Sequence, residues 1–105
     1  MASTRRPELV HPAADQLRLV DVLHALADPT RLTIVRTLQE SGERVCGTFP
    51  VNVAPSTLTH HFRVLREAGV VQQREAGKHR LTALRQTDLE ARFPGLLDTI
   101  LRSID

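Results

Sequence analysis

The chain has 105 residues, of which 41% are hydrophobic and 25% are charged, and its formal net charge is +2. This length supports one domain with a modest core, which must be aliphatic because Trp and Tyr are absent and Phe occurs only three times. The single cysteine excludes an intrachain disulfide, and no apolar run approaches the roughly 20 residues that a spanning helix needs. We therefore expect a cytoplasmic protein with no membrane partner and no signal peptide.

The first half of the chain predicts an arm and two helices. Residues 1–14 show no hydrophobic period and are expected to form a flexible arm, followed by one domain over residues 15–105. Residues 15–27 predict a helix with more apolar surface than one core face needs, which favours contact with a partner chain. Within it, His24 is expected to be a hydrogen-bonded structural histidine rather than a metal ligand. Asp28 and Pro29 suit the start of a second helix, which ends at Ser41-Gly42.

The middle of the chain predicts a helix-turn-helix. Gly47 and Pro50 interrupt residues 43–54, so we expect a short or broken first helix there, with residues 52–54 as the turn. A longer helix follows, with Pro55 at its first position and Gly69 just past its end. Its apolar stripe consists of Leu58, Phe62, Leu65 and Ala68.

The opposite face of this longer helix is polar and cationic. It carries side chains that can hydrogen-bond base edges or phosphates, namely Ser56, Thr57, Thr59, His60, Arg63 and Arg66. His61 is expected on the flank of the helix, because adjacent helical residues point about 100° apart.

A cationic hairpin is predicted directly after that helix. Residues 70–74 and 80–84 flank the loop 75–79, in which Gly77 supplies the turn, and Arg74, Lys78 and Arg80 gather near the tip. Residues 55–85 hold six Lys/Arg against two Asp/Glu, whereas the rest of the chain has no excess of positive charge. A cationic helix followed by a cationic hairpin predicts a recognition helix and a wing that bind double-stranded DNA.

The end of the chain predicts two short helices. Thr87 to Glu90 has the form of a capping box, and Pro94 should end this first helix near Phe93 and start a second one. The apolar residues of the second helix, together with two from residues 15–27, form the predicted dimer interface: Leu17, Val20, Leu97, Ile100, Leu101 and Ile104. The predicted fold is mainly α with a small β-hairpin, a winged helix-turn-helix with N- and C-terminal dimerisation helices.

Two segments resemble the ArsR/SmtB family of bacterial winged-helix repressors. Residues 24–32, His-Ala-Leu-Ala-Asp-Pro-Thr-Arg-Leu, resemble the "LADPTRL" boundary between the first two helices of that family. Residues 56–71, Ser-Thr-Leu-Thr-His-His-Phe-Arg-Val-Leu-Arg-Glu-Ala-Gly-Val-Val, resemble its recognition helix running into the wing. The resemblance covers about residues 16–85, and it implies a homodimer that binds a pseudo-palindromic operator and leaves it when an inducer arrives.

The chain departs from the metal-sensing members of that family. These often hold a Cys-Val-Cys pair at the start of the helix-turn-helix, where this chain has Cys46 alone. Others bind metal on the last helix through Asp/His and His/Glu pairs, where this chain offers Asp88, Glu90 and Asp98 without a histidine. We therefore expect no metal site and no cofactor, and a small-molecule or redox inducer.

The sequence leaves two interpretations open for the role of Cys46 and two for the function of the whole chain. Cys46 is a candidate redox sensor, with a small buried hydrophobic residue as the alternative reading. For the whole chain the alternative to operator binding is a winged-helix module for protein–protein contact. An enzyme is not expected. No acidic residue accompanies Ser56, Thr57 and His60 to orient them for catalysis, and the sequence has no Gly-rich phosphate loop.

Overall fold

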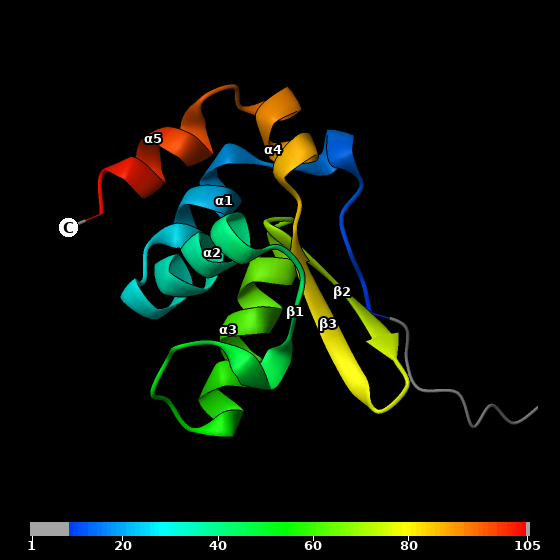
Figure 1. Cartoon of the computed structure of the whole chain (residues 1–105). Coiled ribbons are helices and arrows are strands. Elements are labelled where there is room, and N and C mark those ends of the chain that lie inside the picture. The colour runs from blue at the N-terminus through cyan, green and yellow to red at the C-terminus, as the bar shows by residue number, and fades with distance from the viewer. Residues whose placement is uncertain (1–8, 105) are drawn as a thin grey trace, which may run out of the picture.

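The computed structural model describes residues 9–104. In chain order the elements are the 3-10 helix η1 (Ala14–Gln16), α1 (Leu19–Leu26), α2 (Pro29–Ser41), β1 (Arg44–Val45), the 3-10 helix η2 (Cys46–Thr48), α3 (Pro55–Glu67), β2 (Val71–Ala76), β3 (His79–Leu84), α4 (Gln86–Arg92) and α5 (Leu96–Arg102). The hairpin of β2 and β3 extends away from α4 and α5, and α3 lies beside β1 and the hairpin (Figure 1). Among the helices of residues 9–104, none is long and apolar enough to cross a membrane.

The N-terminal helix begins later than the sequence predicts. A helix starting at Asp15 is wrong: η1 ends at Gln16, the backbone is extended at Leu17 and Arg18, and α1 starts at Leu19. The reason is the position of Leu17, which is only 1% exposed and packs so close to Gly69 that a Cβ there would clash with it. The extended backbone places Leu17 in the core, which a continuous helix would not do.

The boundaries of α2 and α3 are confirmed. The Asp28 side chain accepts a hydrogen bond from the Arg31 N–H at 3.0 Å, and Pro29 is the first residue of α2. Pro55 likewise begins α3, and Gly69 has a φ of 84°, in the left-handed region that favours glycine after a helix.

Of the short or broken helix predicted over residues 43–54, only a short turn is present, and a strand that was not predicted precedes it. Arg44 and Val45 form β1, which pairs antiparallel with β3 and makes a three-stranded sheet of order β1-β3-β2. Only the single turn η2 is helical in this stretch, and residues 49–54 have no regular structure. A strand of only two residues forms because the edge of β3 is available for pairing. This contact is long-range, and no local period in the sequence predicts it.

The hairpin is present, but its strands are longer and its turn is tighter than predicted. Pairing continues to Ala76 and His79, so Gly77 and Lys78 form a two-residue turn in place of the five-residue loop. Gly77 has a φ of 62° at the first central position, as a type II′ hairpin turn favours.

The C-terminal helices correct two further predictions. The capping box at Thr87 is wrong, because α4 begins at Gln86 with Arg85 as N-cap. The Glu90 carboxylate instead accepts from the Gly95 N–H, at 3.1 and 3.2 Å, and so supports the link to α5. The first helix ends at Arg92 with Phe93 as its C-cap, near the predicted position, but α5 starts at Leu96 rather than Pro94.

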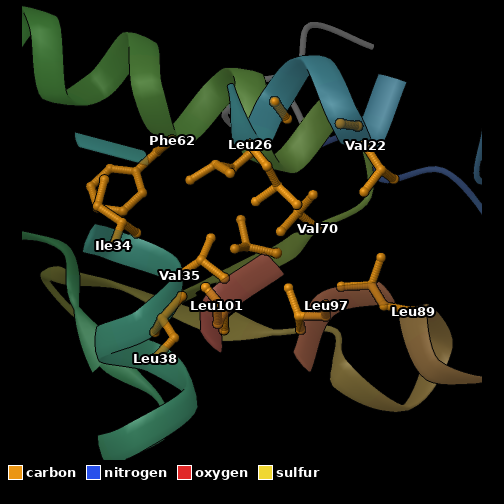
Figure 2. Packing of buried hydrophobic residues seen from close by; sticks show 14 of the residues in the cluster. Val22, Leu26, Ile34, Val35, Leu38, Phe62, Val70, Leu89, Leu97 and Leu101 are labelled. Carbon is orange, nitrogen blue, oxygen red and sulfur yellow. The ribbon is translucent and has the colours of Figure 1, made fainter. Parts of the chain in front are cut away.

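The core lies between the helices and the sheet. Figure 2 shows Leu26 from α1, Val35 from α2 and Phe62 from α3 around one apolar interior, with Leu97 and Leu101 entering from α5. Val70, just before β2, is fully buried among them. Because α3 contributes its apolar stripe to this core, its opposite face is left in solvent.

Candidate nucleic-acid interface

The polar face of α3 is exposed as predicted. The exposed residues are Ser56, Thr57, Thr59, His60 and Arg63, whereas His61, Phe62 and Leu65 are buried on the other side. Thr59 donates to the Pro55 carbonyl at 3.0 Å, so its hydroxyl is held against the helix backbone. The face is a continuous row of hydroxyl, imidazole and guanidinium groups of the size that enters a major groove.

A buried polar contact holds α3 against the corner between α1 and α2. His61 is 8% exposed, and its Nδ1 lies 3.1 Å from Nη1 of Arg31, which is also 8% exposed. The same guanidinium donates from Nε to the Ala25 carbonyl at 2.6 Å. The expected flank position of His61 is therefore wrong. Helical spacing indicates that His60 and His61 diverge, but not which elements lie opposite each ring.

The basic residues of the wing differ in their partners. Arg74 donates to both carboxylate oxygens of Glu43, at 3.0 and 3.3 Å, and Arg80 donates to Glu75 at 3.0 Å. These exposed ion pairs contribute on the order of 0–1 kcal/mol and can be exchanged for phosphate contacts at little cost. Lys78 is exposed at the turn between the strands.

Arg66 is placed differently from the other predicted DNA-binding residues. Its Nη1 donates to the Gln73 side chain at 2.7 Å, so the guanidinium faces β2 rather than the exposed row of α3. Burial lowers the pKa of Arg66, and the nearby Arg80 guanidinium lowers it further. Sequence reasoning assigned Arg66 to the DNA face by helical position alone.

Gln73 is a buried polar centre that the sequence analysis missed. It is 5% exposed, and its side-chain amide donates to Thr82 Oγ1 at 3.0 Å and to Cys46 Sγ at 3.3 Å. Its backbone N–H donates to His11 Nε2 at 3.0 Å. Gln73, in β2, therefore connects η2, β3, α3 and the N-terminal arm. The alternating pattern of β2 indicates that residue 73 faces inward, but a buried amide is uncommon enough to escape that reasoning.

The described part of the N-terminal arm packs against the wing. The Arg85 guanidinium donates to the Pro12 carbonyl at 2.7 Å, and His11 is bonded to Gln73. Burial lowers the pKa of His11, and the positive charges of Arg66 and Arg85 lower it further. Of the arm predicted over residues 1–14, residues 1–8 lie outside the described part of the chain.

Cys46 and the histidines are not gathered into a metal-binding cluster. The thiol of Cys46 is half-buried, 3.2 Å from Thr82 Oγ1. Among residues 9–104 no three His, Cys, Asp or Glu side chains converge on a point that could hold a metal ion. His24 is exposed, contrary to the expected structural role of its ring; its backbone carbonyl accepts from Arg31 at 3.4 Å.

The predicted dimer interface divides into buried and exposed residues. Leu17, Leu97 and Leu101 are 1%, 6% and 5% exposed within the single chain, so they belong to the core and offer little surface to a partner. Val20 is 70% exposed, and Ile100 and Ile104 are partly exposed. Two further apolar residues beside Val20 do not belong to the predicted interface set but are also exposed, Leu19 by 45% and Leu23 by 43%.

An exposed polar helix beside a cationic β-hairpin, both fixed on a helical core, defines a DNA-binding protein of the winged helix-turn-helix class. Residues 28–73 match the family model described as "Bacterial regulatory protein, arsR family". The uncharacterized HTH-type transcriptional regulator YceK of Bacillus subtilis (strain 168) is 36% identical over 89 residues, which cover 82% of this chain and 88% of YceK.

Two further comparisons agree with this match. A putative arsenical resistance operon repressor ArsR of Halobacterium salinarum is 44% identical over 64 residues, covering 58% of this chain and 50% of that protein. The crystal structure of the transcriptional repressor BigR from Xylella fastidiosa aligns with a TM-score of 0.65 and 29% identity, covering 83% of this chain and 86% of BigR.

The chain belongs to the arsR family of bacterial regulatory proteins. The predicted resemblance and the predicted mainly α winged fold are thus confirmed. The chain is a transcriptional regulator with a DNA-binding helix-turn-helix fold, and regulators of this family are not enzymes.

Proposed function

We propose that the protein is a homodimeric, sequence-specific transcriptional repressor that binds a pseudo-palindromic operator and is released by a signal other than a bound metal ion. The observation that carries this proposal is the division of α3 into two faces. One face is locked to the core through Phe62 and His61, and the other presents hydroxyl, imidazole and guanidinium groups to solvent.

In the proposed complex α3 enters the major groove and the wing contacts the sugar-phosphate backbone. Ser56, Thr57, Thr59, His60 and Arg63 would contact bases and adjacent phosphates, and Arg74, Lys78 and Arg80 would contact phosphates. Arg66 has a supporting role, because its guanidinium is bonded to Gln73 and positions the wing against α3.

Dimerisation through the terminal helices is supported by their exposed apolar side chains. Leu19 and Val20 lie on the first turn of the short helix α1 and Leu23 lies on the next. Ile100 and Ile104 border a hollow of about 770 Å³ between α2 and α5. A two-fold axis through these surfaces would present two α3 helices to half-sites about one helical turn, or a multiple of it, apart.

Ligand counting supports a signal other than metal. A closed zinc-type site takes four N, S or O ligands, and no three candidate ligands converge among residues 9–104. The proposed signals are oxidation or alkylation of Cys46, or a small organic molecule. Either would act by favouring a dimer geometry in which the two α3 helices no longer match the half-sites.

The experiment that tests the proposal is a footprint of the full-length protein on the DNA upstream of its own gene, followed by binding titrations across salt concentrations. An operator-binding repressor protects an inverted repeat, and its affinity for that site falls with salt and exceeds its affinity for random duplex by about a thousandfold or more. A module used only for protein–protein contact would give no footprint and no preference between the two duplexes.

A further inference from the structure

A cavity of about 320 Å³ lies between α3, η2 and the wing. Its walls differ in character. Its lining combines apolar residues of α3, namely Pro55, Leu58 and Phe62, with two arginines, Arg66 and Arg80. The volume is at the lower end of the range for sites that enclose small organic molecules, and it is about ten times the volume that one water occupies in the liquid.

The polar side of the cavity has an excess of positive charge. Among residues 9–104 no Asp or Glu lines it, and Arg80, one of the lining residues, donates to Glu75. The positive charges of the two guanidiniums repel each other. Burial lowers the pKa of Arg66, and the charge of Arg80 lowers that pKa further. An anion placed between them would relieve this repulsion.

Arg66 also has unused hydrogen-bonding capacity at this position. Its Nη1 donates to Gln73, but its Nε is buried and has no hydrogen-bond partner among residues 9–104. A buried N–H of a cation without an acceptor costs free energy, which a bound carboxylate oxygen would recover once the guanidinium turns toward the cavity.

We propose that this cavity binds a small amphipathic organic monocarboxylate. The carboxylate accepts hydrogen bonds on the Arg66 and Arg80 side, and the hydrocarbon part packs against Leu58 and Phe62. A lone inorganic anion would satisfy the charge and leave most of the apolar space unfilled. A phosphate of bound DNA would do the same, because it has no apolar substituent to enter the cavity.

Occupancy of the cavity has a consequence for DNA. Thr59 lines the cavity and also belongs to the exposed face of α3, so the ligand lies directly behind a proposed DNA contact. The carboxylate also neutralises positive charge beside that face, which lowers the attraction for phosphates. Because binding linkage is reciprocal, operator DNA must weaken the ligand by the same factor by which the ligand weakens DNA.

The test is a titration of the DNA-free, full-length protein with benzoate and with octanoate, followed through the NMR signals of the arginine Nε–H groups. Benzyl alcohol and octanol supply the same hydrocarbon without charge, and sulfate supplies charge without hydrocarbon. We expect a saturable shift of the Arg66 Nε–H signal with at least one carboxylate, and an affinity at least about tenfold weaker for the alcohols and for sulfate.

The variants Arg66→Gln and Arg80→Gln should each weaken the carboxylate about tenfold or more, whereas Arg74→Gln is the matched control. Arg74 is on the same hairpin, is exposed and does not line the cavity, so its removal should leave binding unchanged. Thermal unfolding checks that each variant folds, and Arg80→Gln carries the test if Arg66→Gln does not fold.

The absence of a saturable shift with both carboxylates would overturn the proposal, as would equal binding of sulfate or an equal loss in Arg74→Gln. Since binding is measured without DNA, the result stands apart from the repressor function proposed above. Competition with operator DNA then tests the coupling separately.

Discussion

Nη1 of Arg31 lies 3.1 Å from Nδ1 of His61, and this contact joins residues 30 positions apart in the interior of the protein. Arg is always protonated and can only donate, so Nδ1 of His61 accepts and its ring proton lies on Nε2. Because His61 adjoins His60 on the proposed DNA-binding face, the contact fixes how α3 is rotated relative to the core.

The first prediction concerns this contact. Arg31→Met should reduce the free energy of unfolding by about 2–4 kcal/mol, because the buried His61 ring and the Ala25 carbonyl both lose their donor. Arg102→Met is the control, since that side chain is 75% exposed and its pairing with Asp98 is on the surface. Urea unfolding measures both, and equal stabilities of the two variants would show that the Arg31 contact stabilises nothing.

The second prediction separates base reading from phosphate contact. Arg63→Ala should weaken operator binding by about 1–3 kcal/mol and relax specificity at one base position, if its guanidinium reads a guanine. Lys78→Ala, at the wing turn, should weaken all duplexes alike and lower the salt slope by about one per protomer. Titrations on operator and random duplex across salt concentrations measure both. Unchanged affinities in the two variants would show that neither α3 nor the wing contacts DNA in the proposed way.

The third prediction concerns the oligomer. Val20→Asp places a charge in the proposed interface, and because Val20 is 70% exposed the change should not disturb the fold of one chain. The variant should sediment as a monomer at micromolar concentration and lose operator binding. Val10→Asp is the matched control, since Val10 is 75% exposed but precedes η1 and α1. A monomeric wild type under the same conditions would refute the dimer.

The fourth prediction is a pH dependence of the N-terminal arm. Burial, Arg66 and Arg85 hold the pKa of His11 below its ordinary value of 6.5, so the unfolded chain binds a proton that the docked arm excludes. The stability that the arm contributes is therefore present above pH 6.5 and is lost as the pH falls below it, when His11 becomes charged and Nε2 can no longer accept from Gln73.

Hydrogen-exchange protection of the Gln73 amide measures this effect. Protection, corrected for the intrinsic rate at each pH, should decrease from pH 8 to pH 5 in the wild type. It should be low at every pH in His11→Ala. His79→Ala, which removes an exposed imidazole of the hairpin, should retain the wild-type profile. A wild-type profile without any pH dependence would contradict the docking of a neutral His11.

The fifth prediction is that the inducing signal is independent of a transition metal. Protein purified without chelator should hold no stoichiometric zinc or copper, and added metal should leave operator affinity unchanged. Stoichiometric metal that releases the operator would overturn this expectation. Cys46→Ser then separates the remaining signals: a variant that binds the operator but no longer responds to peroxide identifies the thiol as the sensor.

Local signals in the sequence predicted the helix boundaries well where the cause was local. Asp28 and Pro29 start α2, Pro55 starts α3, and Gly69 follows it, because capping and backbone preferences act within a few residues. The exposed face of α3 followed from helical period alone. The exposed row that we propose to contact DNA was therefore predictable apart from Arg66.

Several of the misplaced features depend on contacts between distant segments. Leu17 leaves the helical pattern to reach Gly69, and β1 exists because β3 offers an edge. The burial of His61 depends on Arg31, and the burial of Gln73 depends on Cys46 and Thr82. Spacing along the chain holds no information about such pairings, so neither the cavity nor the arm contact could be predicted from the sequence.

The position of the arm beside β2 also restricts how copies of the protein can associate. β2 is an edge strand, and an exposed strand edge can pair with the edge of another chain and begin aggregation. Here the backbone N–H of Gln73, which would otherwise be free to pair with a further strand, already donates to the His11 ring. Pro12, which follows His11 in the sequence, has no N–H of its own. The wing edge is thus closed to strand addition at its centre, which favours the exposed apolar side chains of the helices for the proposed contact between two copies.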